Sequence, residues 1–110
     1  MISDLPPALI PAVRIFIGEF DEHLEFFRQN IEKIADDDVK TAVGHKFHTI
    51  RGSSGFLQLA EIKELSERGE KLCKTAEDPI QLSAALLPIV EQLAVHFDSL
   101  KQEVDGLGDS

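Results

Sequence analysis

Apolar residues recur at alternating spacings of three and four along most of this chain, and this spacing permits few structures other than helices. A helix turns by about 100 degrees per residue, so residues spaced in this way share one face and are buried together. The first such stripe has eight members: Ile10, Val13, Ile17, Phe20, Leu24, Phe27, Ile31 and Ile34. No segment alternates apolar and polar residues as a half-buried strand would. We therefore expect an all-α chain.

Residues that start or end helices divide the pattern into four helices, at about residues 8–35, 38–57, 59–77 and 79–104. Asp36, Asp37 and Asp38 interrupt the first pattern and supply an N-cap, because a carboxylate accepts the free amide protons of the next helix. Pro88 lies inside the fourth stripe, where the unbroken periodicity favours a kink over a split. No proline separates the second helix from the third, so the boundary near Gln58 has the weakest signal.

Four amphipathic helices with short connections predict an antiparallel up-and-down four-helix bundle, because each helix can bury its stripe only against the others. The small residues Ser66 and Gly69 in the third stripe would let a neighbouring helix approach closely. A length of 110 residues and 43% hydrophobic content fit a single domain over residues 1–110. We expect packing within one chain, and hence a monomer.

The composition also restricts the partners and the compartment. A formal net charge of -9 argues against nucleic acid and against an anionic membrane surface, since both reward clustered lysine and arginine. Cys73 is the only cysteine, which indicates a buried residue in a reducing compartment. The sequence has no signal-peptide pattern and no segment that approaches the ~20 apolar residues of a membrane span. We therefore expect a soluble cytoplasmic protein.

The stretch from Phe47 to Leu59 has features that helix stability alone does not explain. Gly52 and Gly55 lie in its interior, although each costs about 1 kcal/mol relative to alanine. Both share a helical stripe with His48, opposite the core face, so we expect His48 to face solvent beside bare backbone. Arg51 lies one turn on, within reach of an anion attached to the imidazole. A merely solvated histidine is the alternative, but it would not require the glycines.

The segment His48-Thr49-Ile50-Arg51-Gly52 resembles the His-x-x-Lys/Arg-Gly motif of histidine phosphotransfer domains. The wider stretch is most similar to the N-terminal phosphoacceptor domain of chemotaxis-type histidine kinases, and the residues from Leu65 to Leu72 resemble the segment that supplies that family's glutamate. The resemblance implies that His48 accepts a phosphoryl group on Nε2 and that Arg51 contacts the phosphate. It also implies that Gly52 keeps the approach open and that Glu70 accepts a hydrogen bond from Nδ1.

By this resemblance the chain is a phosphorelay intermediate of two-component signalling, with a histidine kinase catalytic domain and a response-regulator receiver domain as partners. It would carry the phosphoryl group rather than act as an enzyme, because it has no Gly-rich nucleotide loop and no carboxylate set for Mg²⁺. We expect no cofactor in this chain and assign the Mg²⁺ to the partner. Gly55 and Phe56 lie on the His48 side and would give a partner access, unless the chain bends and buries Phe56.

Three positions depart from the family pattern. Arg51 replaces the commoner lysine, Gln58 replaces a glycine, and Glu67 stands where chemotaxis-type members often have a second histidine. The departures at Gln58 and Glu67 motivate a second hypothesis, a helical adaptor that binds a kinase or receiver without phosphotransfer.

Two further alternatives concern the residues near the motif. The first alternative is that Glu70 has no role in phosphotransfer and is an ordinary surface carboxylate on a highly charged helix. His45 and His48, at positions i and i+3, would share a metal ion with Glu70 in a third hypothesis. Known bundle sites assemble more inward-facing carboxylates than this face offers, so we predict no metal.

Overall fold

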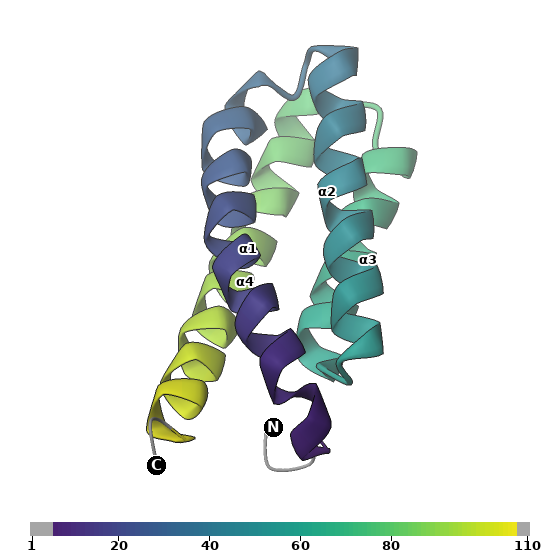
Figure 1. The fold of residues 1–110 in the computed structure, drawn as a ribbon. Helices are drawn as coiled ribbons and strands as arrows, with labels where there is room; N and C mark the ends of the chain where they lie inside the picture. The colour runs from purple at the N-terminus through teal and green to yellow at the C-terminus, as the bar shows by residue number, and fades with distance from the viewer. Residues whose placement is uncertain (1–5, 108–110) are drawn as a thin grey trace.

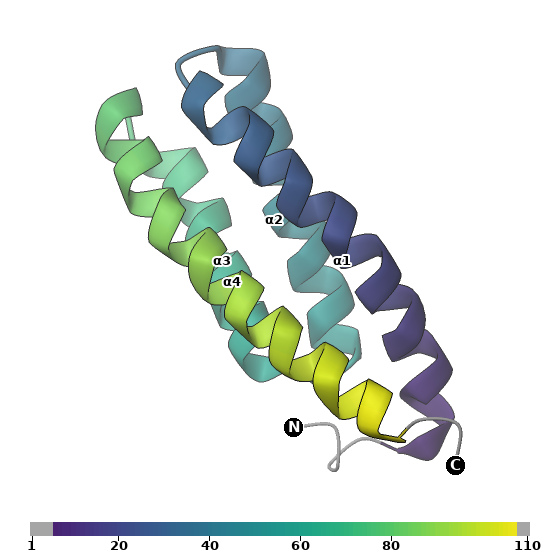
Figure 2. The same cartoon turned by 90° about the vertical axis from the view of Figure 1, so that its left-hand side faces the viewer.

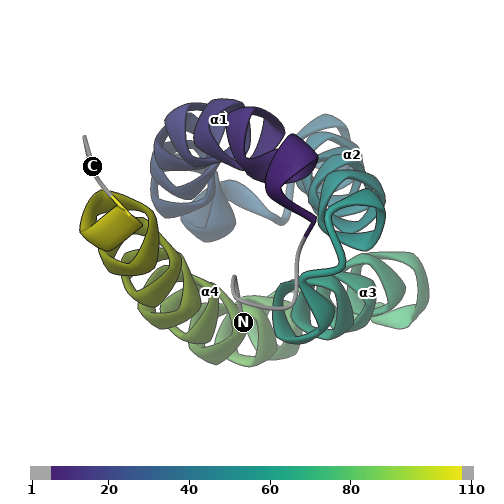
Figure 3. The same ribbon diagram turned by 60° about the horizontal axis from the view of Figure 1, so that its bottom comes forward.

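The computed structural model describes residues 6–107, which form four long helices and no strand. The helices are α1 (Ile10–Asn30), α2 (Asp37–Phe56), α3 (Ala60–Thr75) and α4 (Pro79–Leu107), and two 3₁₀ segments, η2 (Pro7–Leu9) and η3 (Ile31–Lys33), flank α1. Consecutive helices run in opposite directions (Figure 1). Viewed along the bundle, they surround a common axis, and each packs against two neighbours (Figure 3). The predicted all-α, up-and-down bundle is confirmed.

The core consists of the four apolar stripes, and stacked phenylalanines connect them. The ring of Phe27 on α1 stacks on Phe47 of α2 with a centroid distance of 4.4 Å. At the middle of α1, Phe20 stacks in the same way on Phe97 of α4, with a centroid distance of 5.0 Å. Phe20, Phe27 and Phe47 are fully buried. Because each buried aromatic ring removes a large apolar area from water, these pairs hold α1 against both neighbours.

The first helix ends earlier than the sequence predicts. α1 ends at Asn30 and continues as the 3₁₀ segment Ile31–Lys33, so the helical stretch ends two residues before the predicted end at about residue 35. A 3₁₀ helix has three residues per turn, which places Ile31 and Ile34 on the same face, and both are buried. Asp36 then caps α2 as predicted, since its Oδ1 accepts the amide protons of Asp38 at 2.8 Å and Val39 at 3.4 Å.

The turn between α2 and α3, where the sequence signal was weakest, is a tight helix C-cap. Gln58 has a φ of 62°, a left-handed conformation that favours glycine. It lets the Leu59 amide donate to the Ser54 carbonyl at 2.8 Å and the Gln58 amide donate to the Gly55 carbonyl at 3.2 Å. Leu59 is fully buried and follows the turn directly. Two hydrogen bonds and this apolar anchor therefore fix the turn despite the unfavourable residue at its centre.

The fourth helix passes through Pro88 without interruption, so it is not split (Figure 2). Part of it, Pro79–Gly106, is also long and apolar enough to cross a membrane by length and composition, with a mean hydropathy of 1.4 in an 18-residue window. The expectation that no segment approaches such a span was therefore too strong. The same helix buries a stripe that includes Leu82, Leu86 and Leu93 in the bundle, as core helices of soluble proteins do, so this finding is weak evidence for a membrane.

Helices α2 and α3 approach each other closely at Gly69. A Cβ atom at this glycine would lie 2.6 Å from the ring of Phe47. The sequence predicts a close approach at this small residue, and the structure identifies the ring that fills the space. Phe47 immediately precedes His48, and Gly69 immediately precedes Glu70. The close contact of Phe47 with Gly69 therefore holds His48 and Glu70 side by side at the edge of the interface.

Candidate functional site

The candidate site is centred on His48, an exposed residue on a helix that is otherwise well anchored. Its neighbours Phe47 and Ile50 are fully buried, so the α2 backbone is fixed, while the His48 side chain is 59% exposed. Across the interface, the Glu70 side chain is only 8% exposed. The Nδ1 atom of His48 lies 2.8 Å from Oε2 of Glu70. A fixed, buried carboxylate thus holds one ring nitrogen and leaves the other in solvent.

This geometry selects one tautomer of the imidazole. An ionised carboxylate only accepts hydrogen bonds, so Nδ1 of His48 must carry the proton and donate it to Glu70. Nε2 then has a free lone pair. Arg51 places Nη2 3.1 Å from the same Nδ1, but a guanidinium only donates and cannot bond to a protonated nitrogen. Arg51 forms its ion pair with Glu70 instead, because Nε of Arg51 lies 3.2 Å from Oε1 of Glu70.

Glu70 is ionised because three partners compensate for its burial. Burial alone would raise the pKa of Glu70, but hydrogen bonds from His48 and Lys74 and the charges of Arg51 and Lys74 outweigh it and lower the pKa. Lys74 lies one turn further along α3, with Nζ 3.3 Å from Oε2. The alternative that Glu70 is an ordinary surface carboxylate is therefore wrong: it is a buried anion with a partner on each oxygen.

A hollow of about 380 Å³ opens beside this cluster, between the start of α1 and the end of α2. Gly52 lines it, and a Cβ added there would meet no atom within 4 Å. Phe56 and Ile15 line it too, with 71% and 64% of their surfaces exposed. The question of whether the chain buries Phe56 is thus settled in favour of exposure. Gly55 lies apart from the hollow, because a Cβ there would contact the Lys63 side chain at 3.6 Å.

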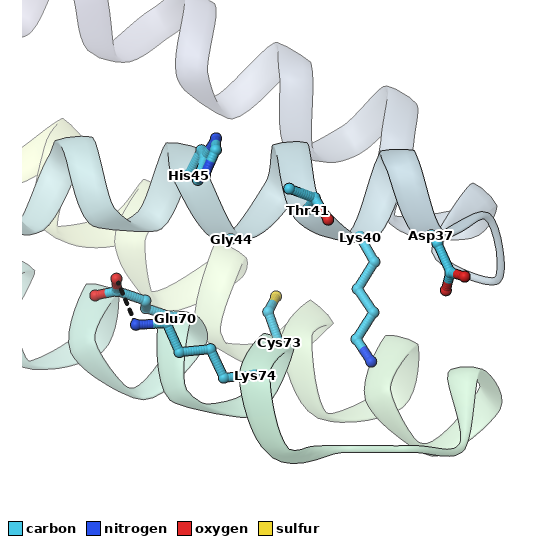
Figure 4. Close-up of a pocket in the computed structure, with 8 residues that line it drawn as sticks. All are labelled: Asp37, Lys40, Thr41, Gly44, His45, Glu70, Cys73 and Lys74. Atoms are coloured by element: carbon cyan, nitrogen blue, oxygen red, sulfur yellow. Dashed lines mark ion pairs between the residues drawn. The ribbon is translucent and has the colours of Figure 1, made fainter.

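A second cavity, of about 360 Å³, lies between α2 and α3 on the other side of Glu70 (Figure 4). Its lining includes His45, Cys73 and Lys74, and the Lys74 side chain extends back along α3 to reach Glu70. Burial raises the pKa of the Cys73 thiol to about 11, so this thiol is neutral at ordinary pH. Within residues 6–107, no group of three or more histidine, cysteine, aspartate or glutamate residues is placed to hold a metal ion.

The structure brings together only some of the residues that the sequence singles out. His48, Arg51 and Glu70 form one contact cluster, whereas Gly52 and Phe56 line the neighbouring hollow. Sequence reasoning missed two contributors, Lys74 at the carboxylate and Ile15 at the hollow. The i, i+4 spacing of Lys74 from Glu70 was a usable signal, whereas the position of Ile15 depends on how α1 packs on α2.

Comparison with known proteins assigns the chain to a family. The model of the Hpt domain family matches residues 11–109, which is nearly the whole chain. The chain therefore belongs to the histidine phosphotransfer (Hpt) domain family, whose members act in two-component phosphorelays. No curated protein matches the chain, and no solved structure does.

Proposed function

We propose that this Hpt domain carries a phosphoryl group on Nε2 of His48, between a histidine kinase catalytic domain and the aspartate of a receiver domain. Members of the family act as phosphocarriers rather than catalysts and interact with both kinds of partner. The observation that carries the proposal is the 2.8 Å contact between Nδ1 of an exposed His48 and a buried, ionised Glu70. It leaves the exposed nitrogen as the nucleophile.

The proposed step uses the chain's own groups in defined roles. The Nε2 lone pair attacks the phosphorus of the donor, and the bond between phosphorus and the donor oxygen breaks with its electron pair leaving on that oxygen. The imidazole becomes cationic because Nδ1 keeps its proton, and the Glu70 carboxylate stabilises that charge. Arg51 uses Nε on Glu70, so its remaining N–H groups are available to the phosphate oxygens.

The hollow beside His48 is the proposed contact surface for the partner. Gly52 leaves its floor open, and the exposed side chains of Phe56 and Ile15 offer apolar contacts at its edges. Apolar anchors of this kind contribute most to transient protein interfaces. The kinase or receiver would also supply the Mg²⁺ and the remaining catalytic groups, and the absence of a cofactor from this chain stays a prediction. Hpt domains are typically soluble and cytoplasmic. We propose that this chain is cytoplasmic and monomeric.

Chemical phosphorylation tests the proposal without knowledge of the natural partner. Phosphoramidate donates its phosphoryl group to a nucleophilic histidine and releases ammonia, and ³¹P NMR detects the product. We expect one acid-labile phosphohistidine in the parent protein and none in His48→Gln. His45→Gln is the matched control, because His45 is also an exposed histidine of α2, one turn earlier, and this variant should label normally. Equal labelling of the parent and His48→Gln would refute the proposal.

The adaptor hypothesis gives a different result in the same experiment. An adaptor would bind its receiver or kinase through the hollow and show no phosphohistidine at His48. Gly52→Gln separates docking from chemistry, because the larger side chain occupies the hollow while Glu70 is untouched. We expect this variant to accept phosphate from phosphoramidate as the parent does, but to exchange it more slowly with a protein partner.

A further inference from the structure

Glu70 is held by a residue that the family motif does not include. Oε2 of Glu70 has two partners: Nδ1 of His48 at 2.8 Å from α2 and Nζ of Lys74 at 3.3 Å from α3. Arg51 occupies the other oxygen. The oxygen that orients the histidine is therefore the same oxygen that Lys74 neutralises. A surface ion pair elsewhere on α3, Lys63 with Glu67 at 3.8 Å, has no such third partner among the described residues.

We infer that Lys74 is a positioning residue for the phosphoacceptor, acting through Glu70. This inference rests on the proposed role of His48. Only an ionised carboxylate accepts the Nδ1 proton as an anion, and Lys74, with Nζ 3.3 Å from the same Oε2, stabilises that ionised form. Lys74 thus keeps the Nδ1 anchor in place and leaves Nε2 as the free nitrogen.

The other groups around Glu70 do not take the place of Lys74. From α2, His48 and Arg51 contact the carboxylate, and His45 and Lys40 line the adjoining cavity (Figure 4). Lys40 donates to the Ala76 carbonyl at 2.8 Å and is directed away from Glu70. From α3, Cys73 lies near Glu70, but its thiol is neutral. Lys74 is therefore the cation on the α3 side that acts directly on this carboxylate.

The direction of the effect follows from the charges. Lys74 contributes to the lowered pKa of Glu70, so Lys74→Met lets Glu70 take up a proton at a higher pH. Protonated Glu70 no longer accepts the Nδ1 proton as an anion does, so the anchored tautomer is lost. This loss moves the acid limb of the His48 phosphorylation profile to higher pH. Because the Lys74 side chain is 71% exposed, water screens the pair, and we expect a shift of about 0.2–0.7 pH unit.

The test compares rates of phosphorylation by phosphoramidate, measured at the His48 NMR signal from pH 4 to 8. The ratio of variant to parent rate removes the donor's own pH dependence. For Lys74→Met we expect a ratio near one at the alkaline end that falls as the pH decreases, and Lys74→Arg should restore the parent profile. Lys71→Met is the matched control, since it removes the same charge from the same helix and Lys71 has no ion pair in the described part of the chain.

A second readout does not depend on phosphorylation. Solvent exchange of the His48 Nδ1 proton should be roughly 1.5- to 5-fold faster in Lys74→Met than in the parent, and unchanged in Lys71→Met. A flat rate ratio with unchanged exchange, or equal effects of the two substitutions, would overturn the inference. If the parent gains no phosphohistidine at His48, the proposed function fails instead, and the exchange measurement still decides the role of Lys74.

Discussion

The close approach of α2 and α3 at Gly69 makes a specific prediction about stability. In Gly69→Ala, the new Cβ would lie 2.6–2.7 Å from three atoms of the Phe47 ring, whereas carbon atoms pack best at about 3.5–4.0 Å. The ring would have to retreat by about 1 Å. It is fully buried and stacked on Phe27 at a centroid distance of 4.4 Å, so nothing yields without disturbing the core.

Two opposing terms set the size of the effect. Overpacking of a core typically costs about 1–3 kcal/mol. Alanine is a better helix former than glycine by about 1 kcal/mol, which offsets part of this cost. Because the buried Phe47 ring cannot move aside freely, the overpacking cost should lie in the upper part of its range, and we expect Gly69→Ala to lower the free energy of unfolding by about 1–2 kcal/mol. For a domain of this size, each kcal/mol corresponds to a fall in Tm of roughly 4–8 °C.

The matched control is Gly52→Ala, the same substitution in the neighbouring helix. No atom lies within 4 Å of a Cβ added there, so only the helix-propensity term applies. The free energy of unfolding should rise by about 1 kcal/mol. Urea unfolding followed by circular dichroism at 222 nm measures both variants. The packing argument is refuted if Gly69→Ala is as stable as the parent, or if both substitutions change stability in the same direction.

Three further predictions concern single residues away from the motif. Gln58→Gly should raise the free energy of unfolding in urea by about 1 kcal/mol, because glycine adopts the observed φ of 62° without strain; a less stable variant would contradict the assigned turn. Burial, with the charge of Lys46, lowers the pKa of His23 below its ordinary 6.5, so the parent should lose stability as the pH falls below 6.5. His23→Leu should lose less stability between pH 7 and 5.5, and it also removes a buried Nδ1 that has no hydrogen-bond partner among the described residues. Because the pKa of Cys73 is about 11, iodoacetamide at pH 8 should label this thiol slowly in the native protein and rapidly in urea; fast native labelling would mean that the cavity admits the reagent to an ionised thiol.

The helices could be predicted from the sequence because each apolar stripe depends only on local spacing. The N-cap at Asp36 was predictable for the same reason, since the capped amides lie two and three residues away. The end of α1 was not, because Ile31 and Ile34 satisfy both an α-helical and a 3₁₀ pattern. The left-handed Gln58 was missed since its residue type disfavours that conformation, and tertiary packing of Leu59 overrides the preference.

The candidate site shows the same division between local and tertiary information. The exposure of His48 follows from its position opposite the core stripe, and the structure confirms it. The burial of Glu70 does not follow from a helix rich in charged residues. It depends on the fit of Phe47 against Gly69, which brings the two helices together one residue before the site. The roles of His48, Arg51 and Glu70 in phosphotransfer remain predictions for experiment.

The most direct test of the account is to locate the phosphoryl group on the imidazole. Long-range ¹H–¹⁵N NMR of the phosphoramidate-treated protein distinguishes the two ring nitrogens of His48. The account predicts phosphorus on Nε2 and a retained proton on Nδ1, hydrogen-bonded to Glu70 as in the unmodified structure. Phosphorus on Nδ1, or on a histidine other than His48, would contradict it.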